Sequence, residues 1–273
     1  MGFLGGAALL TAVVAVSKLL GALYKIPLGN LLGSRGMGCF QAAYNVYGVL
    51  LTLSTAGLPL AMSRLIAQSR GRPRRQRRIF HVALALFLAL GLVGSGVMLT
   101  FPRQLAGLLH NELAAPSIRV LAPALLAVCL LSAIRGYTQG QGQMLPTAVS
   151  QVLEALLKLG IGLPLAWYVL HIGKTAELSA AGAIVGVTAG TAVSMLFLCA
   201  YLVTHRNRKE SLDVPSSSGQ IIKQILLIGV PITLSNSAMS IINIIDTKIV
   251  MGRLQNGLGL SETAAAVLNG QYR

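Results

Sequence analysis

Residues 179–204, SAAGAIVGVTAGTAVSMLFLCAYLVT, form an apolar run without a single charged side chain. The hydrocarbon core of a bilayer is crossed by about 20 apolar residues in helical conformation, so this stretch predicts a membrane-spanning helix. Working outward from it, windows of similar length and hydropathy predict six more helices, at 3–24, 40–66, 79–101, 119–141, 146–170 and 221–250. The sequence therefore predicts an all-α integral membrane protein.

The composition supports a membrane protein over a soluble one. Of 273 residues, 54% are hydrophobic and 11% are charged, whereas about 25% of the residues of a soluble domain are charged. The net charge of +15 would favour nucleic acid as the partner of a soluble chain. Here the densest basic cluster, the arginines at 70–78, lies between two apolar runs and lacks the interleaved aromatic residues of a single-strand binding surface. We expect no nucleic-acid partner.

The distribution of basic residues predicts the orientation of the chain in the membrane. Connections rich in Lys and Arg face the cytoplasm. The arginines at 70–78 follow the second predicted helix, and the next basic group follows the sixth, so both connections lie on the same side of the membrane. This second group consists of Arg206, Arg208, Lys209 and Lys223. This arrangement places the N-terminus in the cytoplasm. We expect the arginine cluster to set the topology and to contact membrane lipids, with a role in gathering substrate as the alternative.

The segment HRNRKESLDVPSSSG, residues 205–219, is the most polar part of the chain and resembles a linker between two lobes. We predict an N-terminal six-helix transmembrane lobe at 1–204, a cytoplasmic linker at 205–220, and the first helix of a second lobe with an outer connection at 221–273. A single helix after the linker does not complete a lobe. We therefore expect a chain truncated from a two-lobe transporter, whose missing C-terminal lobe is a partner.

No motif of a soluble enzyme is present: the chain lacks a GxxxxGK[ST] phosphate loop, an HExxH pair and a GxSxG nucleophile elbow. Cys39, Cys129 and Cys199 are far apart in the sequence and have no neighbouring histidine cluster that would complete a metal site. We expect neither an enzyme nor a bound cofactor or metal.

Ionisable residues inside the apolar segments are the strongest functional signals. A charge at membrane depth costs several kcal/mol unless it faces a wet cavity or finds a partner. Lys18 and Lys25 are seven residues apart, so they project from one face of the first helix and would form a cationic stripe in a cavity. Alternatively, Lys25 extends to the outer interface and Lys18 bonds to a neighbouring carbonyl group.

The fifth segment contains Glu154 and Lys158 at positions i and i+4, an order that favours an ion pair on one helix. The alternative makes Glu154 a titratable or cation-binding group. Arg64 and Arg135 lie near the cytoplasmic ends of the second and fourth segments. Each of these arginines either extends to the interface or lies at the inner mouth of a cavity.

The seventh segment carries Asn236, Asn243 and Asp246 at spacings that align them along one helical stripe, which we expect to face inward. For Asp246, placement at the membrane interface is the alternative. Gly and Pro pairs recur at Gly57 and Pro59, and also at 21 and 27, 162 and 164, and 229 and 231. Interrupted helices of this kind indicate a central transport site.

Three stretches carry a family resemblance: 17–67, which opens with SKLLGALYKIPLGN, then RGYTQGQGQMLPTAVSQVLEALLKL at 135–159 and GVPITLSNSAMSIINIIDTKIVMGRL at 229–254. They resemble the stage V sporulation protein B group of polysaccharide biosynthesis proteins. This group is related to the MurJ-type lipid II flippases of the multidrug/oligosaccharidyl-lipid/polysaccharide (MOP) exporter superfamily, which includes the MATE transporters. The resemblance implies two six-helix lobes around a central cavity, with this chain forming one lobe and the first helix of the second.

The resemblance also implies a function and a site. It implies a flippase in the bacterial plasma membrane that moves an undecaprenyl-linked sugar diphosphate by alternating access. Lys18 matches a cavity cation that meets the diphosphate in this family, and Lys25 lies near a second such position. The second-helix arginines of MurJ-type proteins have no counterpart here, since the stretch near Leu51 and Thr52 is uncharged.

Two other functions are consistent with the residues. One is a cation-coupled multidrug exporter in which a carboxylate such as Glu154 is the coupling group. The other is a nontransporting membrane scaffold that recruits cell-wall synthesis enzymes through the arginines at 70–78.

Overall fold

The computed structural model describes residues 3–55, 57–205 and 217–257, together with residues 259, 261, 264 and 268. Within these ranges the chain is helical and contains no strand. The elements are α1 (Phe3–Thr55), α2 (Leu58–Gln68), α3 (Pro73–Thr100), α4 (Pro102–Leu108), η1 (Glu112–Ala114), α5 (Ala115–Gly140), α6 (Leu145–His171), α7 (Ala176–Thr204), α8 (Ser218–Gly252) and η2 (Arg253–Gly257). The predicted all-α class is confirmed.

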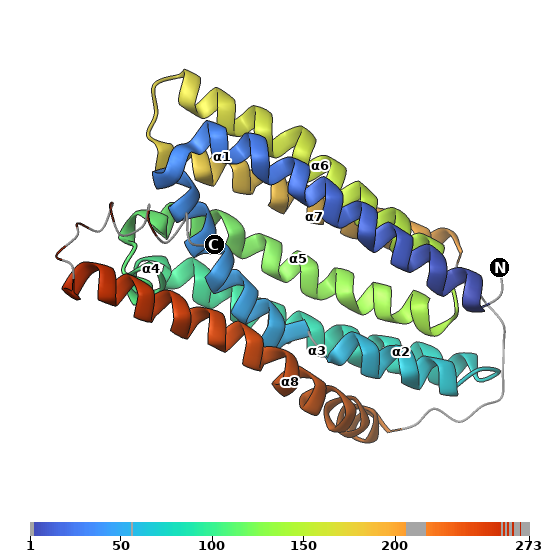
Figure 1. Cartoon of the computed structure of the whole chain (residues 1–273). Coiled ribbons are helices and arrows are strands. Elements are labelled where there is room, and N and C mark those ends of the chain that lie inside the picture. Colours follow the sequence, from blue (N-terminus) through green and yellow to red (C-terminus); the bar gives the residue numbers. More distant parts are fainter. Residues whose placement is uncertain are drawn as a thin grey trace.

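Six of the described helical stretches are long and apolar enough to span a membrane. The first, Ala8–Gln68, has 61 residues, about 90 Å of helix at 1.5 Å per residue, or three times a hydrocarbon core of about 30 Å. It is bent at Gly33, whose φ of 61° and ψ of −176° lie in a region that only glycine occupies readily. Figure 1 shows the two arms of α1, residues 3–32 and 34–55, running in different directions.

The break predicted around Gly57 and Pro59 is confirmed. Helix α1 ends at Thr55 and α2 begins at Leu58, so Pro59 lies in the first turn, where its missing N–H group leaves no hydrogen bond unmade. The predicted segment 40–66 is therefore the second arm of α1 followed by α2.

The other three proline positions do not interrupt their helices. Pro27, Pro164 and Pro231 lie inside α1, α6 and α8, respectively, which continue past them. Packing against neighbouring helices tolerates a proline in a membrane helix, because local adjustments satisfy the freed carbonyl group. The expectation of recurring helix breaks at these positions is wrong.

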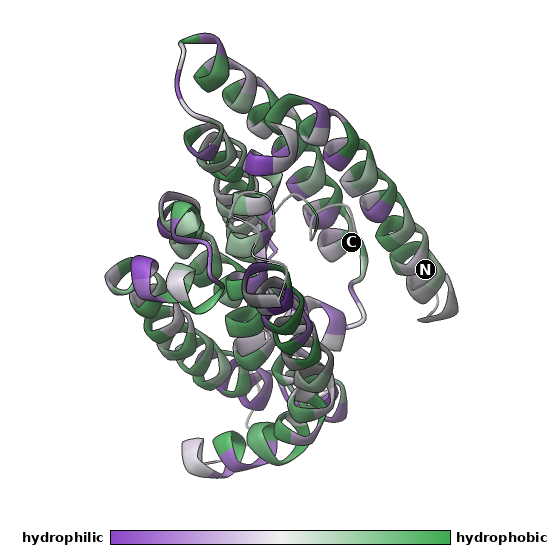
Figure 2. Ribbon diagram, turned by 60° about the vertical axis from the view of Figure 1, so that its left-hand side comes forward, coloured by the Kyte–Doolittle hydropathy of each residue, from purple (hydrophilic) through white to green (hydrophobic). Residues whose placement is uncertain are grey.

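Helix α5 lies between two groups of helices (Figure 1). It packs against α3 on one side and α7 on the other, while α6 packs against α7 and the first arm of α1. Leu121, Leu125 and Cys129 of α5 are fully buried between these neighbours. Figure 2 shows hydrophobic residues along most of the length of the helices, as expected for a surface that faces lipid.

The N-terminal end of α1, the α2–α3 connection and the end of α7 lie at one end of the molecule, and the α6–α7 connection lies at the other (Figure 1). Helix α8 packs against α1, α2 and α3. Where it crosses the start of α2, the N–H group of Gly57 donates to Thr233 Oγ1 at 3.1 Å. The division into lobe, linker and second lobe stays a prediction, and residues 206–216 of the linker lie outside the described residues.

Gly182, Gly186 and Gly190, spaced as GxxxGxxxG, form a close-packing face of α7 against α6. A Cβ atom added to Gly186 would lie 2.3 Å from the backbone nitrogen of Gly162, and one added to Gly190 would lie 2.9 Å from the carbonyl oxygen of Glu154. These contacts bring the backbones of α6 and α7 together, as small residues do in membrane helix pairs.

The α6–α7 contact predicts unequal effects of two glycine substitutions. Gly186→Ala forces the two backbones apart and should destabilise the protein by about 1–3 kcal/mol, lowering its thermal midpoint by roughly 2–8 °C. Gly160→Ala, on α6 in open space, should leave the midpoint unchanged or raise it, because alanine favours the helix. Thermal unfolding in detergent, followed by the reactivity of the buried thiols of Cys39 and Cys129, checks this. Equal midpoints for the two variants would contradict the close packing.

Candidate substrate-binding site

A cavity of about 300 Å³ lies between the first arm of α1 and the middle of α6. Its apolar lining comes from Val14, Leu20, Gly21 and Ala155, and its polar lining from Ser17, Lys18, Tyr24, Gln151, Glu154 and Lys158. Lys18 belongs to the first helical stretch that is long and apolar enough to span a membrane. The cavity therefore lies along a membrane-spanning part of the molecule.

The cationic stripe predicted on the first helix is partly realised in this cavity. Lys18 lines it, and both Lys18 and Lys25 are exposed on the surface of α1. Lys25 does not line the cavity but lies within electrostatic range of Lys158, which α6 contributes from the opposite side. Two ammonium groups, one from each helix, therefore line the same opening.

Lys158 is held by aromatic rings. Its Nζ lies 5.0 Å from the ring centroids of both Tyr24 and Tyr44, within the range of a cation–π interaction. The Tyr24 side chain is fixed in turn, because its hydroxyl donates to the carbonyl oxygen of Ala183 at 3.1 Å and only 1% of the residue is exposed. Both rings face the ammonium group with π-electron density, which stabilises its positive charge.

The predicted ion pair between Glu154 and Lys158 is wrong. Glu154 Oε2 pairs with a terminal nitrogen of Arg135 from α5 at 3.0 Å, and Glu154 Oε1 accepts from Thr191 Oγ1 of α7 at 3.3 Å. Arg135 Nε also donates to Ser150 Oγ at 3.0 Å. The i and i+4 rule describes an isolated helix surface, whereas here the fork of donors on a guanidinium from a neighbouring helix provides the more directional partner.

Arg64 and Arg135, each expected either at the interface or at the inner mouth of a cavity, have different environments in the structure. Arg135 is bound inside the helix bundle, with 17% of its side chain exposed. Arg64 is exposed on α2 and does not line the cavity between α1 and α6.

The polar stripe predicted on the seventh segment can be followed at Asp246. The side chains of Asn236 and Asn243 lie outside the described residues, although both positions belong to α8. Asp246 is half-buried on α8 and does not line the cavity. The inward orientation of the stripe stays a prediction.

Sequence reasoning missed the uncharged polar groups of the site. Ser17 Oγ, Gln151 Oε1 and Tyr44 Oη are buried and, among the described residues, have no hydrogen-bond partner. The Tyr44 ring also packs between Phe40 and Tyr47, at ring-centroid distances of 4.7 and 6.0 Å. The spacing of these aromatic residues on the second arm of α1 was the available signal, since positions i, i+4 and i+7 share a helix face.

The charge balance of the site is positive. Over the part of the chain that the structure describes, the ion pairs are Arg35 with Glu177 and Arg135 with Glu154, and none of the three lysines belongs to either pair. The wall formed by α1 and α6 therefore presents ammonium groups that belong to no described ion pair, although Lys158 interacts with the charge of Glu154. They lie next to hydroxyl and amide oxygens without a described hydrogen-bond partner. Such a wall can hold a multiply charged anion such as a diphosphate, whose oxygens accept several charge-assisted hydrogen bonds.

Comparison with known proteins identifies the family of the chain. The model of the polysaccharide biosynthesis protein family matches residues 3–272. Stage V sporulation protein B of Bacillus subtilis is 28% identical over 237 residues, which cover 85% of this chain and 45% of that protein. The lipid II flippase MurJ of the same organism is 30% identical over 210 residues, which cover 71% of this chain and 39% of that protein. The chain thus spans less than half the length of these two relatives.

Solved structures confirm the predicted transporter-lobe fold. An inward-facing multidrug resistance MATE family transporter of the MOP superfamily superposes with a TM-score of 0.66 over 90% of this chain and 57% of its own, at 23% identity. At this identity the likeness concerns the fold alone. The MATE-like arrangement expected from the resemblance is therefore confirmed.

The Arg135–Glu154 pair predicts a specific pattern of energetic coupling. In a double-mutant cycle, Arg135→Gln and Glu154→Gln should show a coupling energy of at least about 1 kcal/mol, because each single change leaves a charge unpaired among packed helices. Lys158→Gln and Glu154→Gln should show a smaller coupling energy, because Lys158 interacts with the charge of Glu154 without forming a described ion pair with it. The free energy of unfolding of each variant in detergent checks this. A larger coupling of Glu154 with Lys158 than with Arg135 would restore the pairing that the sequence alone suggests.

Proposed function

Since the chain belongs to the polysaccharide biosynthesis protein family, we propose that it forms one side of a flippase in the bacterial plasma membrane that moves an undecaprenyl-linked sugar diphosphate outward. Lys18, Lys25 and Lys158 hold the diphosphate in this proposal. The observation that carries it is the position of Lys18 and Lys158 in one cavity between two membrane-spanning helices, with Lys25 within electrostatic range of Lys158 and none of the three in a described ion pair.

The energetics of burial support this role. Three unpaired ammonium groups are costly within a bilayer unless they face water or an anion. A diphosphate needs several cationic partners when it leaves bulk water, since its own charge must be neutralised. The lysines and the substrate headgroup thus reduce each other's cost of entering the membrane.

The surface of α1 next to the lysines suits the lipid part of the substrate. Leu19, Leu23 and Ile26 are 65%, 58% and 66% exposed and follow one another at about one-turn spacing on α1. We propose that the prenyl chain lies along these residues while the diphosphate contacts Lys18 and Lys158.

A second lobe completes the proposed transporter. The two curated relatives are more than twice as long as their matched segments, and we propose that a second lobe, beginning with α8, supplies the opposite wall of the cavity. Transport then follows a rocking of the two lobes, biased toward whichever state binds the diphosphate better. The Arg135–Glu154 pair argues against the cation-coupled alternative, because a coupling carboxylate must exchange its partner for a proton or a metal cation.

The proposed role of the lysines predicts a loss of translocation in the full-length protein. Lys158→Gln and Lys18→Gln each remove charge-assisted hydrogen bonds to the diphosphate and should slow the translocation of a fluorescent undecaprenyl-diphosphate sugar in proteoliposomes by roughly tenfold or more. Lys174→Gln is the matched control, since Lys174 is exposed in the α6–α7 connection. Wild-type rates in both cavity variants, with normal insertion, would refute the assignment.

The proposed orientation, with the N-terminus in the cytoplasm, predicts opposite labelling at the two ends of the molecule. Arg72 and Lys174 are exposed in connections at opposite ends. A membrane-impermeant thiol reagent added to intact cells should label Lys174→Cys, and Arg72→Cys only after permeabilisation, relative to the background of the parent chain. The reverse pattern would invert the orientation and the direction of transport.

A further inference from the structure

We propose that a second, larger cavity binds an anionic phospholipid from the leaflet next to the arginine-rich end of the molecule. This cavity has a volume of about 1030 Å³ and lies between α3, α5 and α7. It shares no lining residue with the cavity between α1 and α6. The lipid bound here is therefore a resident lipid, distinct from the transported substrate.

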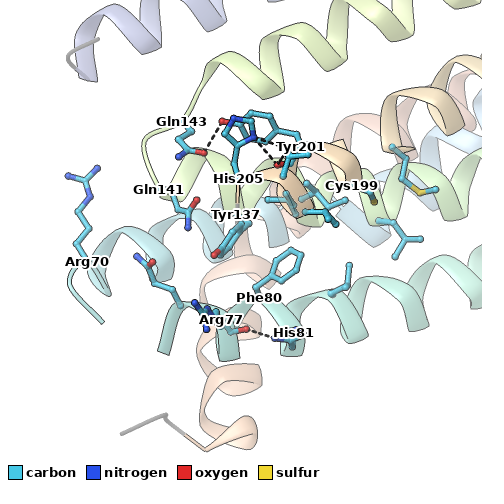
Figure 3. Close-up of a pocket in the computed structure, with 18 of the residues that line it drawn as sticks. Arg70, Arg77, Phe80, His81, Tyr137, Gln141, Gln143, Cys199, Tyr201 and His205 are labelled. Carbon is cyan, nitrogen blue, oxygen red and sulfur yellow. Dashed lines mark hydrogen bonds between the residues drawn. The ribbon is translucent and has the colours of Figure 1, made fainter. Parts of the chain in front are cut away.

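The cavity is basic at its end next to the α2–α3 connection. Arg70 and Arg77 line it together with His81 and His205, and no Asp or Glu occurs among its described lining residues. The Arg70 guanidinium extends towards the turn after α5, where a Cβ atom on Gly142 would lie 3.3 Å from one of its terminal nitrogens. Figure 3 shows Arg70 and Arg77 on the same side of the cavity. An anion or a hydrogen-bond acceptor complements the described groups at this end.

The walls of the cavity are aromatic and amide side chains. Phe80 of α3 lies 4.6 Å from Tyr137 of α5, measured between ring centroids, and Tyr201 of α7 stacks on His205 at 4.3 Å. The Tyr201 hydroxyl donates to Gln143 Oε1 at 3.4 Å. Figure 3 shows these groups around the opening. Aromatic and amide groups of this kind suit the depth of lipid headgroups and their glycerol esters.

The floor of the cavity is apolar. Leu84, Leu130, Ile134 and Leu202 line it, on helices that span the membrane. Inorganic phosphate would use only the basic end, and a soluble anionic ligand would leave the apolar floor uncovered. A phospholipid matches both parts, since basic pockets between membrane helices on the cytoplasmic side bind anionic headgroups and the floor takes the first segment of an acyl chain.

Native mass spectrometry of the protein with defined lipids tests the proposal. The wild type should retain phosphatidylglycerol roughly tenfold or more better than phosphatidylcholine with the same acyl chains, and glycerol 3-phosphate should not displace it. Arg70→Gln combined with Arg77→Gln should abolish the preference. Arg72→Gln combined with Arg74→Gln removes the same charge from two residues that do not line the cavity and should preserve it.

Fluorescence quenching then locates the lipid. Cys199 lines the cavity and is the exposed cysteine, whereas Cys39 and Cys129 are buried. A bimane label on Cys199 should be quenched more strongly by brominated phosphatidylglycerol than by brominated phosphatidylcholine. Trp167, the single tryptophan of the chain, lies outside this cavity and should be quenched equally by both lipids.

Several results would overturn the proposal. They are equal retention of the two lipids by the wild type, a preference that persists without Arg70 and Arg77, and an equal preference at Trp167 and at the label on Cys199. Displacement of the lipid by glycerol 3-phosphate would also overturn it, because the site would then recognise phosphate without the acyl chain. None of these results depends on the identity of the transported substrate.

Discussion

A charged side chain inside a membrane must find a counter-charge or face water, and the arrangement of α1, α5, α6 and α7 follows from this constraint. Helix α6 carries both a carboxylate, Glu154, and an ammonium group, Lys158, one turn apart. The carboxylate turns towards α5 and α7, where Arg135 and Thr191 bind it. The ammonium group turns towards α1, where it meets two aromatic rings. Helix α6 therefore carries the paired Glu154 on the side facing α5 and α7, and Lys158 on the side facing the cavity with α1.

Close packing of α6 and α7 makes this division possible. Because Gly186 lets α7 lie against the backbone of α6 at Gly162, Tyr24 of α1 can donate to the carbonyl oxygen of Ala183 on α7 while its ring lies beneath Lys158. The same approach at Gly190 brings Thr191 to Glu154. The glycine stripe therefore has a consequence for function, since it positions both the paired and the unpaired charges.

Hydropathy and charge predicted much of this from the sequence. The spans, the break at Gly57 and the glycine packing face could be found because each depends on residues near one another in the sequence. The partner of Glu154 could not be found, since Arg135 reaches it from another helix and only the packing of α5 on α6 decides the choice. The role of Tyr44 was missed for the same reason, because the bend at Gly33 brings the second arm of α1 near α6.

The central claim is that the lysines around the α1–α6 cavity contact a diphosphate. The most direct test is solid-state NMR of the full-length protein with ¹⁵N-labelled lysine in proteoliposomes that contain an undecaprenyl-diphosphate sugar. Diphosphate ³¹P should dephase a lysine ammonium ¹⁵N signal, and that signal should be missing in Lys158→Gln. A bound diphosphate that dephases no lysine ammonium signal would contradict the claim.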